Sequence, residues 1–254
     1  KKYPHIFQMA LYGDAYHNEY NLQRAKYVDA VSVTDKNALI HPNMFWFPPQ
    51  VFSDYFDNHN IGDIPWENRA YAVVFCGNNR GNRKEILDYL HRNNIPIDVW
   101  GTGWEGSVFN YHAPCTVEES FEIYKKAKIV LNEFIDDYCY YSGVKSCKKN
   151  MDDFFQYPCC QNKSCPKFKP KDAYCSDRLM ISAYSGTPIM VTKKNGLESI
   201  LELDSECIIV NKKNIVEKTK AMLNNKNMAS EIGRKAQEKV RQFNFEKLLE
   251  KFLT

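Results

Sequence analysis

From about residue 70 onward, the sequence alternates between short runs of β-branched and aromatic residues and longer stretches whose apolar residues recur at helical spacing. The run 70–76 (AYAVVFC) stops at a Gly-Asn-Asn turn, and a helical pattern over 83–93 follows it. Alternating strands and helices of this kind build βαβ units around a parallel sheet. We therefore predict an α/β fold with a doubly wound, Rossmann-like parallel sheet.

The same alternation continues to the C-terminus. Strands are predicted at 97–100, 129–132, 188–191 and 207–210, and helices at 117–127, 177–185, 196–200, 215–223, 228–243 and 245–253. The first 57 residues hold a smaller pattern, with strands predicted at 6–12, 28–33 and 45–47. So short a stretch is too small for an independent doubly wound domain. We predict a truncated α/β portion in 1–57, a linker at 58–69 containing Gly62 and Pro65, and one domain in 70–254 with an insertion at 136–174.

Composition narrows the class of protein. The chain has 254 residues, of which 44% are hydrophobic, enough for a packed core. A formal charge of +3 with interspersed signs does not favour a nucleic-acid partner. No apolar run reaches the roughly 20 residues that cross a bilayer, so we expect a soluble, cytoplasmic protein without a transmembrane segment. The chain begins with Lys1 and soon enters a strand-like run, so we expect an additional N-terminal domain in the natural protein.

The nine cysteines fall into two groups. Cys76, Cys115 and Cys207 lie in or near strand-like segments and are expected to be core thiols in a reducing compartment. The others crowd into one segment: Cys139, Cys147, Cys159, Cys160, Cys165 and Cys175. Between Lys145 and Lys171 this segment also holds seven lysines against two aspartates.

Structural zinc, disulfides and free thiols on a lysine-rich loop all stay open for the clustered cysteines. Their spacing is not a paired CxxC arrangement, which argues against zinc, and a nucleic-acid-binding zinc element is a more remote interpretation. No DxD pair stands in a donor-site context, so we expect no metal at the active site and no cofactor.

The order of several motifs resembles a known family. The segments 27–35 (YVDAVSVTD) and 45–48 (FWFP) are similar to the end of the acceptor-side half of GT-B glycosyltransferases. The segments 74–78 (VFCGN), 101–104 (GTGW) and 127–132 (AKIVLN) resemble the donor half of that superfamily, with its group 1-like domain. The series is closest in kind to the spore-maturation-type group of glycosyltransferases.

The most specific motif is 176–188 (SDRLMISAYSGTP), which is followed by 196–198 (GLE). It resembles the helix, turn and loop that hold the nucleotide sugar in this superfamily. The family usually places a ribose-binding glutamate five residues before the glycine, whereas this chain has Ile181 there. The departure puts ribose recognition and the donor type in question.

The resemblance implies a transferase that moves a sugar, a hexose or a pentose, from a nucleotide-activated donor to a hydroxyl of a glycan, protein or small molecule. The donor-binding residues expected from it are Gly77, Asn78, Arg83, Gly103, Asn132, Ser176, Arg178, Gly186, Thr187 and Glu198. Helix N-termini behind glycine turns bind phosphates through free backbone N–H groups, which suits Arg83 and Arg178 as diphosphate contacts. Glu198 would bind hydroxyl groups of the donor.

Each assignment has a plainer alternative. Arg83 and Arg178 also fit ordinary βα turns with solvated arginines, and Gly186 fits a glycine that ends a helix before a strand. Glu198 at a helix start is also stabilised by the helix dipole.

The catalytic base is expected from the N-terminal portion, because GT-B reactions occur between two halves. Asp14, directly after a strand-like run, is the first candidate and His17 the second. An Asx-type turn with an exposed histidine explains the same residues.

A noncatalytic carbohydrate- or protein-binding module that keeps the fold is the alternative function. Ile181 and the short N-terminal portion favour it. Whether transfer inverts or retains the anomeric centre stays open.

Overall fold

The computed structural model describes residues 7–11, 23, 25–34, 36, 39, 41–49, 56, 64–79, 83–132, 175–193, 196–244, 246–247 and 250. These residues form two compact units. The first takes its described residues from 7–49, 175–176 and 196–199, and the second from 56–132, 177–193 and 200–250.

The first unit contains a small parallel sheet. Its strands are β1 (Met9–Leu11), β2 (Ala30–Val33) and β3 (Met44–Trp46), in that order across the sheet. All four residues of β2 are buried because β2 is the central strand. The side chain of Asn43 donates hydrogen bonds to the carbonyl oxygens of Ala25 and Val28, at 2.6 and 2.8 Å, and so closes the turn before β3.

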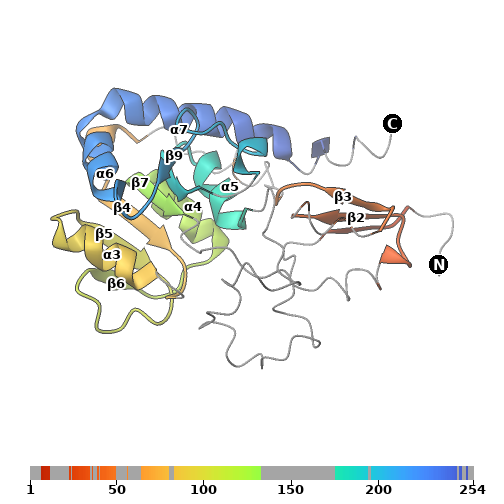
Figure 1. The fold of residues 1–254 in the computed structure, drawn as a ribbon, viewed down its shortest axis with the longest axis horizontal. Coiled ribbons are helices and arrows are strands. Elements are labelled where there is room, and N and C mark those ends of the chain that lie inside the picture. The colour runs from red at the N-terminus through yellow and green to blue at the C-terminus, as the bar shows by residue number, and fades with distance from the viewer. Residues whose placement is uncertain are drawn as a thin grey trace. The chain divides into compact units, whose positions relative to one another are not determined.

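The second unit is built on a six-stranded, fully parallel sheet (Figure 1). Its strands are β4 (Tyr71–Cys76), β5 (Ile97–Trp100), β6 (Asn110–His112), β7 (Ala127–Asn132), β8 (Ile189–Thr192) and β9 (Ile208–Val210). Their order across the sheet is β6-β5-β4-β7-β8-β9. Counted from β4, this is the 3-2-1-4-5-6 order of a doubly wound fold, so the predicted fold class is confirmed.

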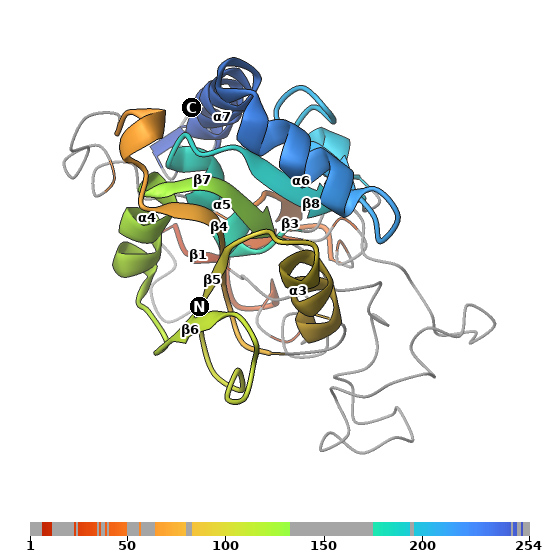
Figure 2. The same ribbon diagram turned by 90° about the vertical axis from the view of Figure 1, so that its left-hand side faces the viewer.

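Helices cover both faces of this sheet, as Figure 2 shows for α3 and α4. They are α3 (Arg83–Arg92), α4 (Val117–Lys125), α5 (Asp177–Tyr184), α6 (Ile215–Asn224) and α7 (Lys226–Val240). One apolar cluster joins Val73 and Val99 of the sheet to Leu87 of α3, Ile215 of α6 and Ile232 of α7. Helices α4 and α5 pack on β7 from the other side. Burying both faces explains why the central strands are continuous apolar runs rather than alternating ones.

Most predicted elements are present within one to three residues of their expected bounds. The exception is β6, which the sequence did not indicate. All three of its residues are exposed, so it carries no apolar pattern and forms only one edge of the sheet. The helix predicted over 228–243 begins at Lys226 and tightens after Val240 into a 3₁₀ turn, Arg241–Phe243. Residues 64–69 of the linker predicted at 58–69 are described, and Trp66–Asn68 form the 3₁₀ helix η3. The helix predicted at 245–253 lies largely outside the described residues.

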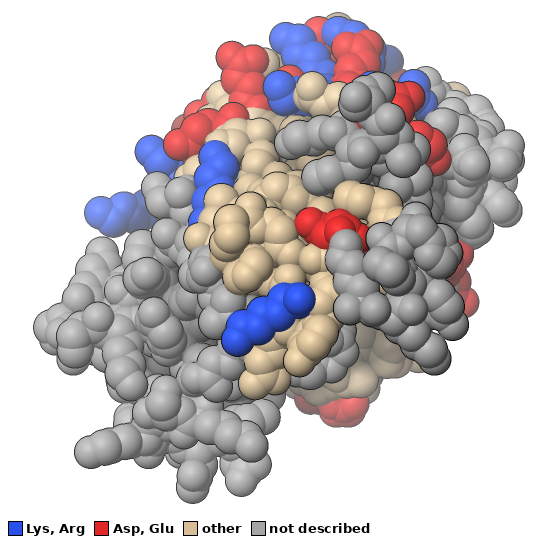
Figure 3. Space-filling view, turned by 90° about the vertical axis from the view of Figure 1, so that its right-hand side faces the viewer, with Lys and Arg blue, Asp and Glu red and all other residues tan. Residues whose placement is uncertain are grey.

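The described surface carries mixed charge. On the face drawn in Figure 3, lysine, arginine, aspartate and glutamate side chains are scattered among neutral residues. No described helix has the length and apolar character needed to cross a membrane.

Candidate functional site

The sheet of the second unit has one topological switch point, between β4 and β7. The chain leaves β4 toward β5 on one side, whereas β7 and β8 extend the sheet on the other side. In open parallel sheets, ligands bind at such a point, outside the carboxyl ends of the strands. The residues at these ends are Gly77 after β4 and Asn132 at the end of β7. The candidate site therefore begins at these two residues.

Two turns at this edge are hydrogen-bonded to each other. One turn follows β4 (77–79) and the other follows β5 (101–103). The Asn79 N–H of the first donates a hydrogen bond to the Thr102 carbonyl of the second, at 2.9 Å. The Thr102 N–H donates to Asn78 Oδ1 at 3.1 Å, and the Asn79 side chain donates to the Gly103 carbonyl at 2.7 Å. The structure thus brings together Gly77, Asn78 and Gly103, which the sequence predicted from separate motifs.

A close backbone approach explains one glycine in these turns. A Cβ atom built on Gly101 would lie 2.3 Å from the carbonyl oxygen of Gly77. The same Gly77 oxygen accepts a hydrogen bond from Trp104 Nε1 at 2.8 Å. Only glycine lets the two turns approach this closely.

Two arginines converge on the aromatic ring of Phe75. The guanidinium carbon of Arg83 lies 5.2 Å from the ring centroid, and that of Arg178 lies 5.7 Å from it. Arg83 Nη1 donates to the Asn78 carbonyl at 2.7 Å, and Arg178 Nη1 donates to the Cys76 carbonyl at 3.0 Å. Two residues far apart in sequence are therefore held at the end of β4.

The electrostatics of this arrangement favour an anion. Arg83 is the first residue of α3 and Arg178 the second residue of α5, so both guanidinium groups lie at the positive ends of helix dipoles. Cations at that end of a helix are unfavourable, and the acidic residues Glu85 and Asp177 in the same first turns offset this only in part. Arg178 is half-buried and Arg83 is almost fully buried. A phosphate group would relieve the repulsion and accept bidentate hydrogen bonds from guanidinium.

Behind the turns lies a layer of buried polar groups. Asn132 is buried, and its Nδ2 donates to Ser182 Oγ at 3.2 Å. The neighbouring Cys115 side chain, and then burial, raise the pKa of the Cys76 thiol far above its ordinary value. Burial also raises the pKa of Tyr124. These groups are neutral at pH 7, so they leave the positive field of the arginines uncancelled.

The thiols correct one prediction. Cys76 and Cys207 are buried as expected, and burial raises the pKa of Cys207 to about 12. Cys115 is half-exposed rather than in the core, because it follows the exposed edge strand β6. Its hydrogen bond with Cys76 lowers the pKa of Cys115. Cys175 is buried, and the other five clustered cysteines lie outside the described residues.

Gly186 and Thr187 lie elsewhere. They follow α5 and precede β8, at the amino-terminal edge of the sheet, and so are not brought together with Gly77 and Asn132. Gly186 has a φ of +72° and ends the helix. Thr187 is fully buried, and its hydroxyl donates to the Tyr124 carbonyl at 2.6 Å. Both positions match the plainer alternative of a helix-ending turn.

The remaining predicted residues belong to the first unit or lie outside the described residues. Ser176 directly precedes α5, at the position expected for an N-cap. Glu198 is exposed in the 3₁₀ helix η5 (Leu197–Ser199), which belongs to the first unit. Asp14 and His17 lie outside the described residues. Among the residues that the structure does describe, no group of three or more His, Cys, Asp or Glu side chains could hold a metal ion.

Sequence reasoning missed the parts of the site that depend on pairing across the sheet. The sequence indicates Phe75 only as a buried strand residue, and Ile181 only as the replacement of a glutamate. In the structure Ile181 is buried in α5, with 6% of its surface exposed. An aromatic residue two positions before the Gly77 turn was the available signal for Phe75.

The strand order, with an anion-favouring pair of turns and arginines at its switch point, defines a Rossmann-like domain of the kind found in GT-B proteins. The chain belongs to a glycosyl transferase-like family, whose family model matches residues 83–254, more than half of the sequence. A search of curated proteins found no match.

Solved structures of glycosyltransferases share the fold. A variant of TarM from S. aureus, solved with UDP, is 13% identical, with a TM-score of 0.60 over 97% of this chain and 50% of that one. HepE from Anabaena, solved with UDP-glucose, is 8% identical, with a TM-score of 0.57 over 96% and 70%. Sucrose-phosphate synthase from Thermosynechococcus elongatus is 13% identical, with a TM-score of 0.56 over 96% and 66%. The chain spans about half the length of TarM.

Proposed function

We propose that this chain binds a nucleoside diphosphate sugar at the switch point of its larger sheet and takes part in transfer of the sugar to a hydroxyl group. The observation that carries the proposal is the convergence of Arg83 and Arg178 on Phe75 beside the Gly77 turn. The family membership and the UDP-bound structures of similar fold support it.

Each residue has an assigned role in this proposal. Arg178 contacts the diphosphate, and Arg83 fixes the turn that presents the Asn78 backbone. Asn132 is buried at the end of β7, beside the switch point, and helps to form the floor of the proposed site. Polar contacts of this kind stabilise the charge that develops on the diphosphate as the glycosidic bond breaks.

The remaining roles follow from the family resemblance. Ser176 begins the α5 helix that presents Arg178, and Glu198 binds hydroxyl groups of the donor. Asp14, or failing it His17, takes the proton of the acceptor hydroxyl. The finer assignment is to the spore-maturation-type group, with transfer of a hexosyl or pentosyl group to a glycan, protein or small molecule.

The reaction proceeds without a metal ion in this proposal, because the arginines supply positive charge at the diphosphate. It takes place in the cytoplasm, which suits the free thiols of Cys76, Cys115 and Cys207. Transferase activity that survives EDTA supports a reaction without a metal ion. Activity that returns only on addition of Mg²⁺ or Mn²⁺ contradicts it.

The test of donor binding is a thermal-shift screen of the purified chain against UDP, GDP, CDP and their common sugars. A ligand that binds only the folded state raises Tm. We expect a selective shift with one nucleotide and its sugars. A folded chain that shifts with none of them contradicts the proposed donor site.

A noncatalytic binding module is the second candidate, and the burial of Ile181 favours it because the usual ribose-binding carboxylate is missing. Slow hydrolysis of the bound nucleotide sugar would identify an enzyme. Tight nucleotide-sugar binding with neither hydrolysis nor transfer to any acceptor would favour the module.

A further inference from the structure

Two thiols that the donor site does not use meet at the carboxyl edge of the larger sheet. Cys76 ends β4 and is in register with Trp100 of β5, which in turn is in register with His112 of β6. The chain then turns back from β6 through residues 113–116 to α4, which packs on β4. This return brings Cys115 into a side-chain hydrogen bond with Cys76.

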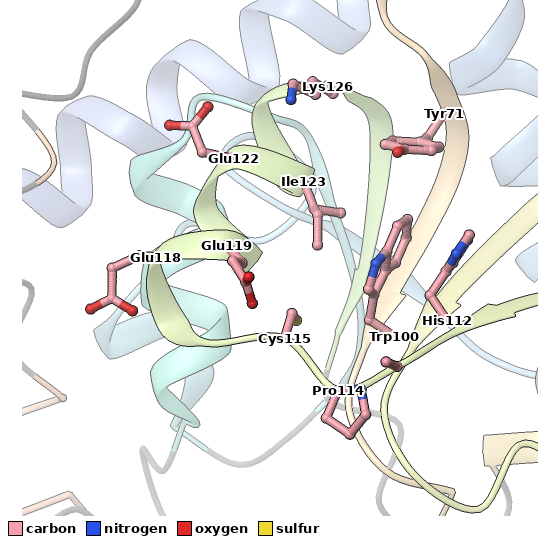
Figure 4. Close-up of a pocket in the computed structure, with 11 residues that line it drawn as sticks. Tyr71, Trp100, His112, Pro114, Cys115, Glu118, Glu119, Glu122, Ile123 and Lys126 are labelled. Carbon is pink, nitrogen blue, oxygen red and sulfur yellow. The ribbon is translucent and has the colours of Figure 1, made fainter.

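The two thiols differ in their access to solvent. Cys76 is buried, with 4% of its surface exposed, whereas Cys115 is half-exposed. Cys115 lines a groove of about 610 Å³ beside α4, and Figure 4 shows its side chain among the lining residues. Cys76 is not part of that lining. A small reagent that enters the groove therefore meets Cys115 and not Cys76.

The hydrogen bond gives each sulfur a different role. It lowers the pKa of Cys115 and, together with burial, raises the pKa of Cys76. On ionisation, Cys115 is therefore the thiolate that accepts the bond, and Cys76 is the thiol that donates it. The thiolate is the nucleophilic form of cysteine. A solvent-accessible thiolate beside a second thiol is the arrangement typical of cysteines that undergo reversible oxidation.

The charge of the groove selects among oxidants. Its lining includes Glu118, Glu119 and Glu122 together with Lys126, so carboxylates outnumber ammonium groups there. This excess of negative charge repels an anionic oxidant such as glutathione disulfide. Hydrogen peroxide is small and neutral, so it is not repelled.

The segment that carries Cys115 can move toward Cys76. A disulfide needs its two sulfur atoms about 2.05 Å apart, closer than two hydrogen-bonded thiols. Strand β4 is held between β5 and β7, whereas residues 113–116 lie in neither a helix nor a strand. The approach therefore falls on this segment, and the bond can form while the sheet stays intact.

We propose that Cys115 and Cys76 are a redox-active pair that hydrogen peroxide converts into an intramolecular disulfide. The Cys115 thiolate attacks one peroxide oxygen and the O–O bond breaks. Cys115 becomes a sulfenic acid, and the departing hydroxide takes a proton and leaves as water. The Cys76 sulfur then attacks the Cys115 sulfur, the S–O bond breaks, and the hydroxyl group leaves as a second water with the Cys76 proton. The two thiols lose two electrons, which reduce the peroxide to water.

The test is peptide-mapping mass spectrometry of the purified full chain. The protein is fully reduced, treated near pH 7 with hydrogen peroxide in small molar excess, and then alkylated in denaturant. We expect a linked Cys76–Cys115 peptide that disappears on treatment with dithiothreitol. Cys115 should be oxidised at least about tenfold faster than Cys207, because burial raises the pKa of Cys207 and keeps it as the thiol.

Three variants separate the roles of the two sulfurs. Cys76→Ala keeps a small apolar side chain in the core, so the linked peptide should be absent and dimedone should trap a sulfenic acid on Cys115. In Cys115→Ser, Cys76 should stay reduced. Cys207 is another buried thiol of the second unit, and Cys207→Ala should form the linked peptide at the wild-type rate. The linked peptide of the wild type decides the proposal even where Cys76→Ala does not fold.

Three outcomes overturn the proposal. Cys115 stays a thiol or accumulates as a sulfenic acid while Cys76 remains reduced, or Cys115 forms its disulfide with a cysteine of 139–165 instead. Alternatively, glutathione disulfide oxidises Cys115 faster than hydrogen peroxide does. Nucleotide-sugar binding plays no part in these measurements, so the inference stands or falls separately from the proposed function.

Discussion

Phe75 is the residue on which the candidate site is organised. Its side chain is almost fully buried in the core of the second unit, and both guanidinium groups lie against its ring. A buried ring of this kind restricts the two long arginine side chains before any ligand arrives. Restricting them in advance lowers the entropy cost of binding.

Replacing this ring tests its positioning role. Phe75→Leu keeps an apolar core residue but removes two cation–π contacts, each worth about 0.5–1 kcal/mol. We expect the Kd for a nucleoside diphosphate to rise about five- to thirtyfold, the factor that corresponds to losing both contacts. Phe109 belongs to the same core cluster and packs edge-on against Trp104, so Phe109→Leu should destabilise the fold without changing the Kd. Equal effects of both variants on the Kd would contradict the role of Phe75.

Gly101 is required by the approach of two turns. Gly101→Ala would place a Cβ atom 2.3 Å from the Gly77 carbonyl oxygen. Gly106 also has a positive φ, +74°, but a Cβ there would meet nothing within 4 Å. We expect Gly106→Ala to cost about 1–2 kcal/mol of unfolding free energy, from its backbone angle alone. Gly101→Ala should cost about 1–3 kcal/mol more, measured by urea unfolding, because of the steric clash.

Cys115 should react faster than Cys76 and Cys207. Its pKa is lowered by the hydrogen bond with Cys76, whereas the pKa values of Cys76 and Cys207 are raised. The thiolate is the reactive form, and a lowered pKa means that it is present at lower pH than in the unfolded chain. Pulsed alkylation of the native protein near pH 7, read by peptide mass spectrometry, should modify Cys115 before the other two. Equal rates for the three cysteines would exclude this ordering.

At the scale of single elements, helix α4 depends on its capping box. The Thr116 hydroxyl accepts from the Glu119 N–H at 3.2 Å, and the Glu119 carboxylate accepts from the Thr116 N–H at 2.8 Å. Thr116→Ala should lower the unfolding free energy by about 1 kcal/mol. Because the two bonds act reciprocally, Thr116→Ala and Glu119→Ala together should cost less than the sum of the single changes. Strict additivity in a double-mutant cycle would contradict the capping box.

The sequence pattern predicts the buried strands and the amphipathic helices but not the exposed edge strand. Strands β4 and β7 and helix α3 were evident because buried strands are apolar runs and helices repeat at a period near 3.6 residues. The edge strand β6 was missed because exposed strands need no apolar residues. The pairing of β4 with β7 links residues 56 positions apart, such as Tyr71 and Ala127, and no local pattern encodes it.

Site prediction had a corresponding limit. The family resemblance predicts Gly77, Asn78 and Gly103, and the structure brings them together because each follows a strand and the ends of parallel strands meet at one edge of the sheet. Gly186 and Thr187 also stood beside a strand, but before β8 rather than after it. Which end of a strand a motif adjoins decides whether it can meet a ligand at the carboxyl edge.

At the scale of the whole molecule, the account places donor binding in the larger unit. The chain spans about half the length of TarM, so transfer itself, its acceptor and its stereochemistry are proposals about the complete protein. The proposed diphosphate contacts lie at the switch point of this unit, so diphosphate binding can be measured on this chain.

The most direct test is isothermal titration with the nucleoside diphosphate selected by the thermal-shift screen and with the matching nucleoside, which lacks the phosphates. The account predicts that the diphosphate binds more tightly than the nucleoside. Arg178→Ala should weaken the diphosphate about ten- to hundredfold, because a charge-assisted hydrogen bond is worth about 1.5–3 kcal/mol, and should leave the nucleoside unchanged. Arg92→Ala, at an exposed arginine of α3, should change neither. Equal affinity for both ligands, or diphosphate binding that is indifferent to Arg178→Ala, would contradict the proposed site.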